Sequence, residues 1–228
     1  MEIKFKRKIS DYKYLVMFDL ASKITGVCVF DLKEQKPLFT DVIKVTGDIE
    51  LPAAELKNKI DVFFLNLNKR GISLQDVIVS KERLPSQIRG CGSTIQTFMA
   101  LARSHAILDT YLYENNIATY DYIGIAPVTT HAYYKRLVKG DKELKVTKEL
   151  IRSYLYTIYE NLNNISLDES DAVFLAKTLY DVKWNDDISE HIREIKRHRK
   201  TLKAEHAINS LDKEIERLES LKNKVTED

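Results

Sequence analysis

An acidic residue inside a long apolar stretch is the feature that most constrains this chain. Residues 14–20 read YLVMFDL, and residues 26–32, GVCVFDL, resume the apolar pattern after a short polar turn. Both segments are rich in β-branched and aromatic residues, which is typical of paired, buried strands. Asp19 therefore stands near the end of a buried strand, where a carboxylate without a partner would be unfavourable. We expect this side chain to have a partner or a bound cation.

The patterns that follow alternate between strand and helix and indicate an α/β fold. An apolar run at 38–45 completes a predicted three-stranded antiparallel meander. A helical pattern at 51–68 then leads into a strand that ends near Glu82, and a strand reached through such a crossover pairs parallel to an earlier one. The later elements are a long helix at 93–115, a strand at 120–128, and helices at 145–161 and 169–181. This order predicts a mixed five-stranded sheet with helices on both faces.

The composition changes after Trp184. Residues 186–228 are mostly charged, Leu and Ile, with no Gly or Pro. We therefore expect a core domain at 1–185 and a C-terminal helical extension at 186–228. A short heptad pattern in the extension fits a coiled coil and a helical hairpin packed on its own core equally well.

Four carboxylates are predicted to meet at one edge of the sheet. Asp19 and Glu82 end strands that are predicted to be parallel neighbours, and Asp168 and Asp171 share one face of a helix about one turn apart. Carboxylates this close repel one another unless cations neutralise them. Oxygen ligands favour Mg²⁺ or Mn²⁺, and two such ions catalyse phosphodiester hydrolysis. We expect two Mg²⁺ per site, bridged by Asp19.

Each acid also has a purely structural interpretation. Asp19, at the end of a strand, could cap the turn that follows. Glu82 could pair with its neighbours Lys81 or Arg83. Asp168 could be an ordinary helix N-cap, and Asp171 would interact favourably with the helix dipole. Taken one at a time, these interpretations compete with the metal site.

Three segments resemble RuvC-type Holliday junction resolvases. MFDLASKITGVCVFD (17–31) resembles the opening of that family, VIVSKERLPSQIRGCGSTIQTFMALARSHAIL (77–108) its second-acid strand and long helix, and LDESDAVFLAKTLY (167–180) its closing acidic motif. The resemblance spans about residues 14–182. It implies an RNase H-like fold, four catalytic acids at Asp19, Glu82, Asp168 and Asp171, and a homodimer that cuts symmetric strands of a four-way DNA junction.

The resemblance and a basic segment suggest where DNA would lie. HAYYKRLVKGDKELKVTK (131–148) combines six basic residues with two tyrosines and is suited to contact phosphates, although a solvated surface is the alternative. The candidate DNA contacts are Lys23, Thr25, Arg89, Lys135, Arg136, Lys139, Lys145 and Lys148. The family often carries an aromatic residue shortly after the second acid, whereas this chain has Leu84 and Pro85. Either another residue opens the junction, or the preferred substrate is a different branched DNA.

Composition excludes several other classes of protein. The net charge of +2 leaves nucleic-acid affinity to local clusters. Cys28 and Cys91 have no paired spacing, and the chain lacks a signal-peptide pattern or a long apolar run, so we expect a cytosolic protein that does not cross a membrane. None of its seven glycines forms a phosphate cradle, which argues against a nucleotide cofactor. The main alternative to a nuclease is a non-catalytic protein that binds branched DNA or supports an assembly.

Overall fold

The fold was analysed in a computed structural model that describes residues 8–46, 52–84, 95–120, 124–138, 145–199 and 205–224. The strands are β1 (Tyr14–Asp19), β2 (Ile24–Asp31), β3 (Lys36–Lys44), β4 (Val77–Lys81) and β5 (Ala118–Thr119). The α-helices are α1 (Pro52–Lys69), α2 (Ile95–Glu114), α3 (Pro127–Leu137), α4 (Lys148–Ile158), α5 (Leu167–Arg199) and α6 (Glu205–Lys224). Short 3₁₀ turns are η1 (Ile9–Asp11) and η2 (Leu74–Asp76).

The predicted mixed sheet is confirmed. Its strand order is β3-β2-β1-β4-β5. The pairs β1–β2 and β2–β3 are antiparallel, whereas β1–β4 and β4–β5 are parallel. The parallel pairs follow from the crossovers through α1 and α2, because a helix returns the chain to the same edge of the sheet.

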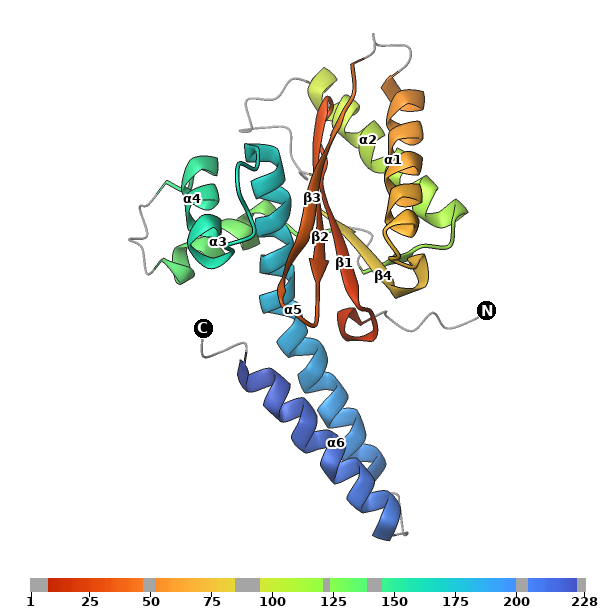
Figure 1. Ribbon diagram of the computed structural model, residues 1–228, viewed down its shortest axis with the longest axis vertical. Helices are drawn as coiled ribbons and strands as arrows, with labels where there is room; N and C mark the ends of the chain where they lie inside the picture. The colour runs from red at the N-terminus through yellow and green to blue at the C-terminus, as the bar shows by residue number, and fades with distance from the viewer. Residues whose placement is uncertain are drawn as a thin grey trace.

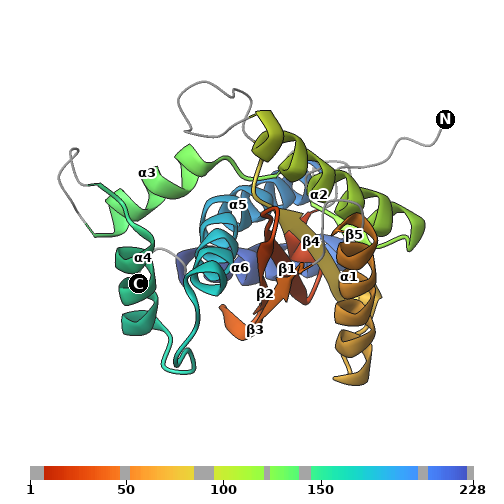
Figure 2. The same ribbon diagram turned by 90° about the horizontal axis from the view of Figure 1, so that it is seen from above.

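Helices cover both faces of the sheet, as Figure 2 shows from above. Alternate residues of each strand point to opposite faces. In β1, Val16 and Phe18 pack toward α1 and α2, while Leu15 and Met17 pack toward α5. These strands are continuously apolar because both of their faces are buried.

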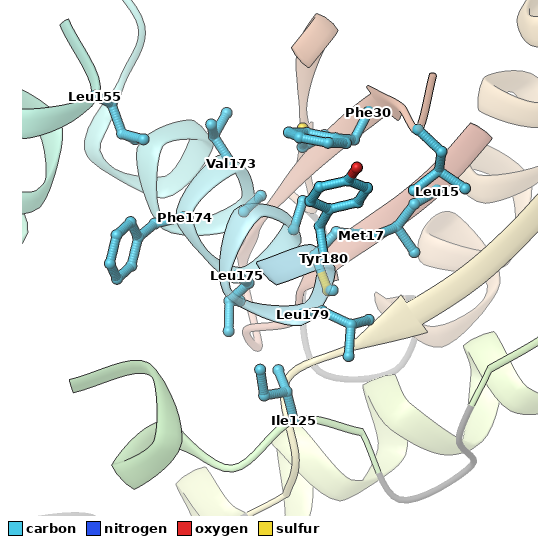
Figure 3. Close-up of a cluster of buried hydrophobic side chains, with 14 of the residues drawn as sticks. Leu15, Met17, Phe30, Ile125, Leu155, Val173, Phe174, Leu175, Leu179 and Tyr180 are labelled. Atoms are coloured by element: carbon cyan, nitrogen blue, oxygen red, sulfur yellow. The ribbon is translucent and has the colours of Figure 1, made fainter. Parts of the chain in front are cut away.

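The first half of α5 lies directly on the sheet. Figure 3 shows its side chains Val173, Leu179 and Tyr180 beside residues of β1 and β2. The Tyr180 ring lies 5.6 Å from that of Phe30, measured between centroids. Phe174, on another side of the helix, packs instead against Tyr133 of α3 and Tyr154 of α4. The N-terminal part of α5 is therefore held between the sheet and the α3–α4 pair.

The last strand differs from the predicted one at 120–128. The structure places β5 at Ala118–Thr119, and Ile125 adds a single parallel bridge to Glu82. Residues 121–123 of the predicted strand lie outside the described residues. Gly124 has a positive φ of 82°, which interrupts an extended chain. Pro127 opens α3, a helix that the sequence analysis did not predict, because proline suits the first turn of a helix as well as it ends a strand.

The helix predicted at 169–181 continues to Arg199. The 33 residues of α5 span about 50 Å, and the C-terminal part projects beyond the sheet together with α6 (Figure 1). Ile192 and Ile195 of α5 form a small core with Ile215 and Leu218 of α6. Of the two interpretations of the extension, the structure shows a helical hairpin with its own core. No helix in the described part of the chain is long and apolar enough to cross a membrane.

Candidate active site

Asp19 and Glu82 lie side by side at one edge of the sheet. The parallel register of β1 and β4 pairs Phe18 with Lys81, and the Glu82 amide donates to the Phe18 carbonyl at 3.1 Å. The next residues in that register are Asp19 and Glu82. Their side chains share the α5 side of the sheet, because Met17, two residues before Asp19, also points there.

The start of α5 brings the other two acids to this edge. Ser166 and Glu169 form a capping box: the Glu169 amide donates to Ser166 Oγ at 3.2 Å, and the Ser166 amide donates to Glu169 Oε2 at 2.8 Å. Glu169 also accepts a 2.6 Å hydrogen bond from the Thr40 hydroxyl of β3, which fixes the helix start to the sheet. Because Ser166 is the cap, the proposal that Asp168 is an ordinary N-cap is wrong, and its carboxylate is available for another role.

Gly26 permits this close approach. It lies opposite Asp19 in the β1–β2 pair. A Cβ atom at this position would stand 2.0 Å from the Asp168 carbonyl oxygen and 3.2 Å from the Glu169 nitrogen. Only glycine lets the backbone of α5 rest on β2 here. The helix that carries Asp168 and Asp171 can thus begin immediately beside Asp19.

A second glycine supports the end of β4. A Cβ atom on Gly124 would lie 2.4 Å from the Lys81 carbonyl oxygen and 3.0 Å from that of Glu82. Ile125 donates to the Lys81 carbonyl at 2.9 Å, and Arg83 donates to the Ile125 carbonyl at 2.7 Å. This bridge fixes the backbone on both sides of Glu82.

Burial and repulsion between carboxylates raise the pKa values of Asp19, Glu82 and Asp171. The pKa of Asp19 is well above its usual range, because of burial first and then repulsion by Glu82, Asp171 and Asp168. Burial and repulsion by Asp171 raise the pKa of Glu82 to about 7, against an opposing hydrogen bond from Asp19. Burial raises the pKa of Asp171 as well. Proton sharing between Asp19 and Glu82 is the expected state of such a pair without added cations.

Lys148 forms ion pairs with both helix-borne acids. Its Nζ lies 2.5 Å from Asp171 and 3.5 Å from Asp168. Burial lowers the pKa of Lys148, but its hydrogen bond to Asp171 and the surrounding carboxylates outweigh burial and raise it. Thr147 caps α4, accepting from the Leu150 amide, and so places Lys148 in the first turn of that helix. A lysine predicted to contact DNA thus forms ion pairs with two of the predicted catalytic acids.

The pairing of Glu82 with Lys81 is wrong. Lys81 is buried on the opposite face of the sheet, where it forms an ion pair with Asp109 of α2. His105 lies close to this pair, and its pKa is lowered to about 4 by burial and by the Lys81 charge. The cation next to Glu82 in sequence therefore does not neutralise it.

The donor set suits a hard divalent cation, although the side chains do not form a closed chelate. In the described part of the chain, no group of three or more His, Cys, Asp or Glu side chains is arranged to hold a metal ion. The four acids nevertheless act on one another electrostatically, and burial together with repulsion between the carboxylates raises the pKa values of Asp19, Glu82 and Asp171. Carboxylate oxygens are the ligands that Mg²⁺ and Mn²⁺ prefer. The residues present fit such an ion on chemical grounds.

The candidate DNA contacts are distributed unevenly. Lys23, Arg136 and Lys145 are exposed, and Lys135 is half-buried. The structure does not support the predicted DNA contact at Thr25. This residue is only 2% exposed, and its hydroxyl accepts a hydrogen bond from the Ala21 amide at 3.4 Å, so it shapes the turn after β1. Arg89 and Lys139 lie outside the described residues.

Sequence reasoning missed the residues that position the acids. A glycine inside a strand, as at Gly26, signals a close backbone approach. The spacing Ser-x-x-Glu at 166–169 is a capping-box pattern. Both signals were present in the sequence, but neither identifies its structural partner. Gly124, inside the strand predicted at 120–128, carried the same signal as Gly26.

Comparison with known proteins reveals similarity in structure but not in sequence. No family model matches the chain, and no curated protein matches it significantly. RuvC of Thermus thermophilus in complex with a Holliday junction substrate matches at a TM-score of 0.51 and 12% identity, over 76% of this chain and 96% of RuvC. A second Thermus thermophilus RuvC structure matches at 0.53 and 12% identity, over 75% and 96%. The chain therefore has the RNase H-like fold of RuvC over about three quarters of its length.

Proposed function

We propose that this protein is a structure-selective endonuclease that cleaves four-way and other branched DNA by two-metal phosphodiester hydrolysis. The observation that carries the proposal is the juxtaposition of Asp19 and Glu82 with Asp168 and Asp171 at the start of α5. RuvC has the same fold, and one of its matching structures holds a Holliday junction substrate. The expected cofactor is Mg²⁺, with Mn²⁺ as a substitute, at two ions per site.

The four carboxylates would hold these ions, with Asp19 in the central position. Bound divalent ions supply an activated water and stabilise the leaving oxygen in this chemistry. The protein's own part is to hold the carboxylates in a largely buried position, where their negative charge favours a cation over a proton once the pH exceeds the pKa of Glu82. Glu82 and Asp19 must therefore lose their shared proton before both can act as ligands.

Lys148 is proposed to move from the acids to the DNA. In the absence of other cations its ammonium group neutralises part of the charge of Asp168 and Asp171. A metal ion at the same carboxylates would compete with it and release the ammonium for a phosphate. The exposed side chains of Lys145, Lys23 and Arg136 would then extend the phosphate contacts, in a sequence-independent way.

The working form is proposed to be a homodimer, because two symmetric cuts in a four-way junction require two active sites. A non-catalytic protein that binds branched DNA remains the alternative. Only the four acids favour the nuclease over this alternative, because carboxylates next to phosphate would weaken a surface that merely binds DNA.

The deciding experiment is cleavage of labelled four-way junctions with Mg²⁺ by the wild-type protein and by Asp19→Asn. We expect wild-type cleavage and a loss of at least about 100-fold in the variant, because the variant removes a charged ligand at the reacting centre. Asp31→Asn, at the opposite end of the β1–β2 hairpin, is the matched control and should cleave normally. Equal cleavage by wild type and Asp19→Asn would remove the proposed metal role. Junction binding without cleavage by wild type would support the alternative.

A further inference from the structure

A small pocket lies on the β5 side of β4, lined by residues on both sides of Glu82 in sequence, Ser80 and Arg83. Its volume is about 280 Å³, and it lies between the end of β4, the chain leading into α3, and the middle of α5. Ser80 of β4 lines it and lies two residues before Glu82 on the same face of the strand. Two residues of a strand span about 7 Å, so the Ser80 wall of the pocket lies about that distance along β4 from Glu82, within the reach of one nucleotide.

The Ser80 hydroxyl shares with those of Ser10 and Thr130 the lack of a hydrogen-bond partner among the described residues, but of these only Ser80 lines this pocket. Ser80 is 1% exposed, and its Oγ makes no hydrogen bond to any residue that the structure describes. The hydroxyl of Thr178, which is equally buried, donates to the Phe174 carbonyl at 2.7 Å. A buried hydroxyl without a partner is unfavourable, and such groups in folded proteins call for an explanation. A ligand with a hydrogen-bonding edge would satisfy it.

The remaining lining of the pocket is apolar at depth and cationic at the rim. Tyr120, Ile125 and Leu179 form largely buried walls. Arg83 is exposed and lines the pocket directly after Glu82. The matching ligand has flat apolar faces, a polar edge for Ser80, and an anionic group for Arg83. A nucleotide has these three features, and the volume lies just below the range for drug-sized ligands, which suits a single base.

We propose that this pocket receives one unstacked nucleobase of the DNA whose backbone lies at the acids. The inference rests on the proposed nuclease function and extends it, because it assigns a site that would hold a branch point open. The base enters between the apolar walls, its edge bonds to the Ser80 hydroxyl, and Arg83 contacts a phosphate of the same nucleotide. Ser80 and Arg83 are positioning residues, since they hold the substrate and do not touch the reacting atoms.

The test uses four-way junctions that carry the fluorescent base analogue 2-aminopurine at successive positions around the branch point. The protein is Asp19→Asn, which binds without cutting, so that base insertion is measured separately from catalysis. We expect a fluorescence rise at one position, showing an unstacked base. Adding Ser80→Leu, which fills the pocket, should abolish the rise, and Arg83→Ala should weaken junction binding by about 3- to 10-fold.

Ser80→Ala in the active protein keeps the shape of the pocket and removes only the hydroxyl. We expect cleavage of junctions to fall about 3- to 10-fold, while the melting temperature of the free protein is equal to or higher than that of wild type. Thr178→Val, which removes a buried hydroxyl that has a partner, should lower the melting temperature and leave cleavage by the folded protein unchanged.

The outcomes separate the two proposals. Unchanged cleavage by Ser80→Ala, or quenched 2-aminopurine at every position, would overturn the base pocket while leaving the nuclease intact. Failure of the wild-type protein to cut any junction would instead overturn the nuclease, and the fluorescence experiment would still report whether a base enters the pocket. If Ser80→Leu does not fold, the Ser80→Ala and Arg83→Ala results decide the matter.

Discussion

Replacing Gly26 by alanine tests the contact that brings the acids together. The added methyl carbon would lie 2.0 Å from the Asp168 carbonyl oxygen and 2.5 Å from its carbonyl carbon. Ordinary contact begins at 3.4 Å, so the start of α5 would have to move by about 1.4 Å. Neither atom can rotate away, because both belong to the backbone of a capped helix. We expect a loss of about 1–3 kcal/mol in the free energy of unfolding.

The same movement should separate Asp168 and Asp171 from Asp19. A misplacement of about 1 Å at a reacting centre lowers rates by about 100-fold. The assay is Mg²⁺-dependent junction cleavage per folded molecule, with urea unfolding measured on the same samples. Gly71→Ala is the matched control: Gly71 has a positive φ of 79° and no neighbour within 4 Å, so alanine strains the loop without moving the acids. Gly26→Ala with wild-type stability and cleavage would refute the reasoning.

Three further perturbations address other parts of the structure. Glu82→Gln should flatten the pH dependence of the free energy of unfolding between pH 4.5 and 7. A carboxyl group whose pKa is raised by folding stabilises the fold at low pH. That stability is lost as the pH rises toward 7, by up to about 1.4 kcal/mol per pH unit. Urea titrations of wild type and variant at several pH values measure the difference. Lys148→Met should weaken DNA binding and reduce its salt dependence, as binding isotherms would show. The control is Leu150→Ala, a half-exposed neighbour, which should leave junction cleavage by the folded protein unchanged. Ile215→Asp places a charge in the small core between α5 and α6, which is separate from the sheet. The variant should unfold the α5–α6 hairpin without lowering the melting temperature of the sheet domain, as circular dichroism can show.

The sheet could be predicted from the sequence because its signals are local. Uninterrupted apolar runs mark β1 and β2, and the helix between β3 and β4 requires the parallel pairing that places Glu82 next to Asp19. The fifth strand and α3 could not be predicted in the same way. Whether Pro127 ends a strand or begins a helix depends on Gly124, whose positive φ is set by its packing on the Lys81 carbonyl. That contact joins residues far apart in the chain.

The candidate site was predicted in part for the same reason. Its four acids lie at strand and helix ends that local patterns identify. The partners that position them, such as Gly26 under Asp168 or Thr40 on Glu169, come from elements distant in sequence. Thr25 was predicted to contact DNA, but strand alternation and the Ala21 hydrogen bond turn it inward.

Lys148 connects the stability of the free protein to its proposed activity. Without another cation, burial and repulsion favour a proton on the Asp19–Glu82 pair, while Lys148 neutralises part of the Asp168 and Asp171 charge. A divalent ion at these carboxylates must therefore displace a proton from one pair and an ammonium group from the other. Binding should release about one proton and gain affinity as the pH rises through 7. Lys148→Met removes only the second competitor, so it should raise Mg²⁺ affinity while preserving the pH dependence. Calorimetric titration of Mg²⁺ in two buffers of different protonation enthalpy measures both quantities, and an unchanged affinity in Lys148→Met would show that the ammonium and the metal do not share the site.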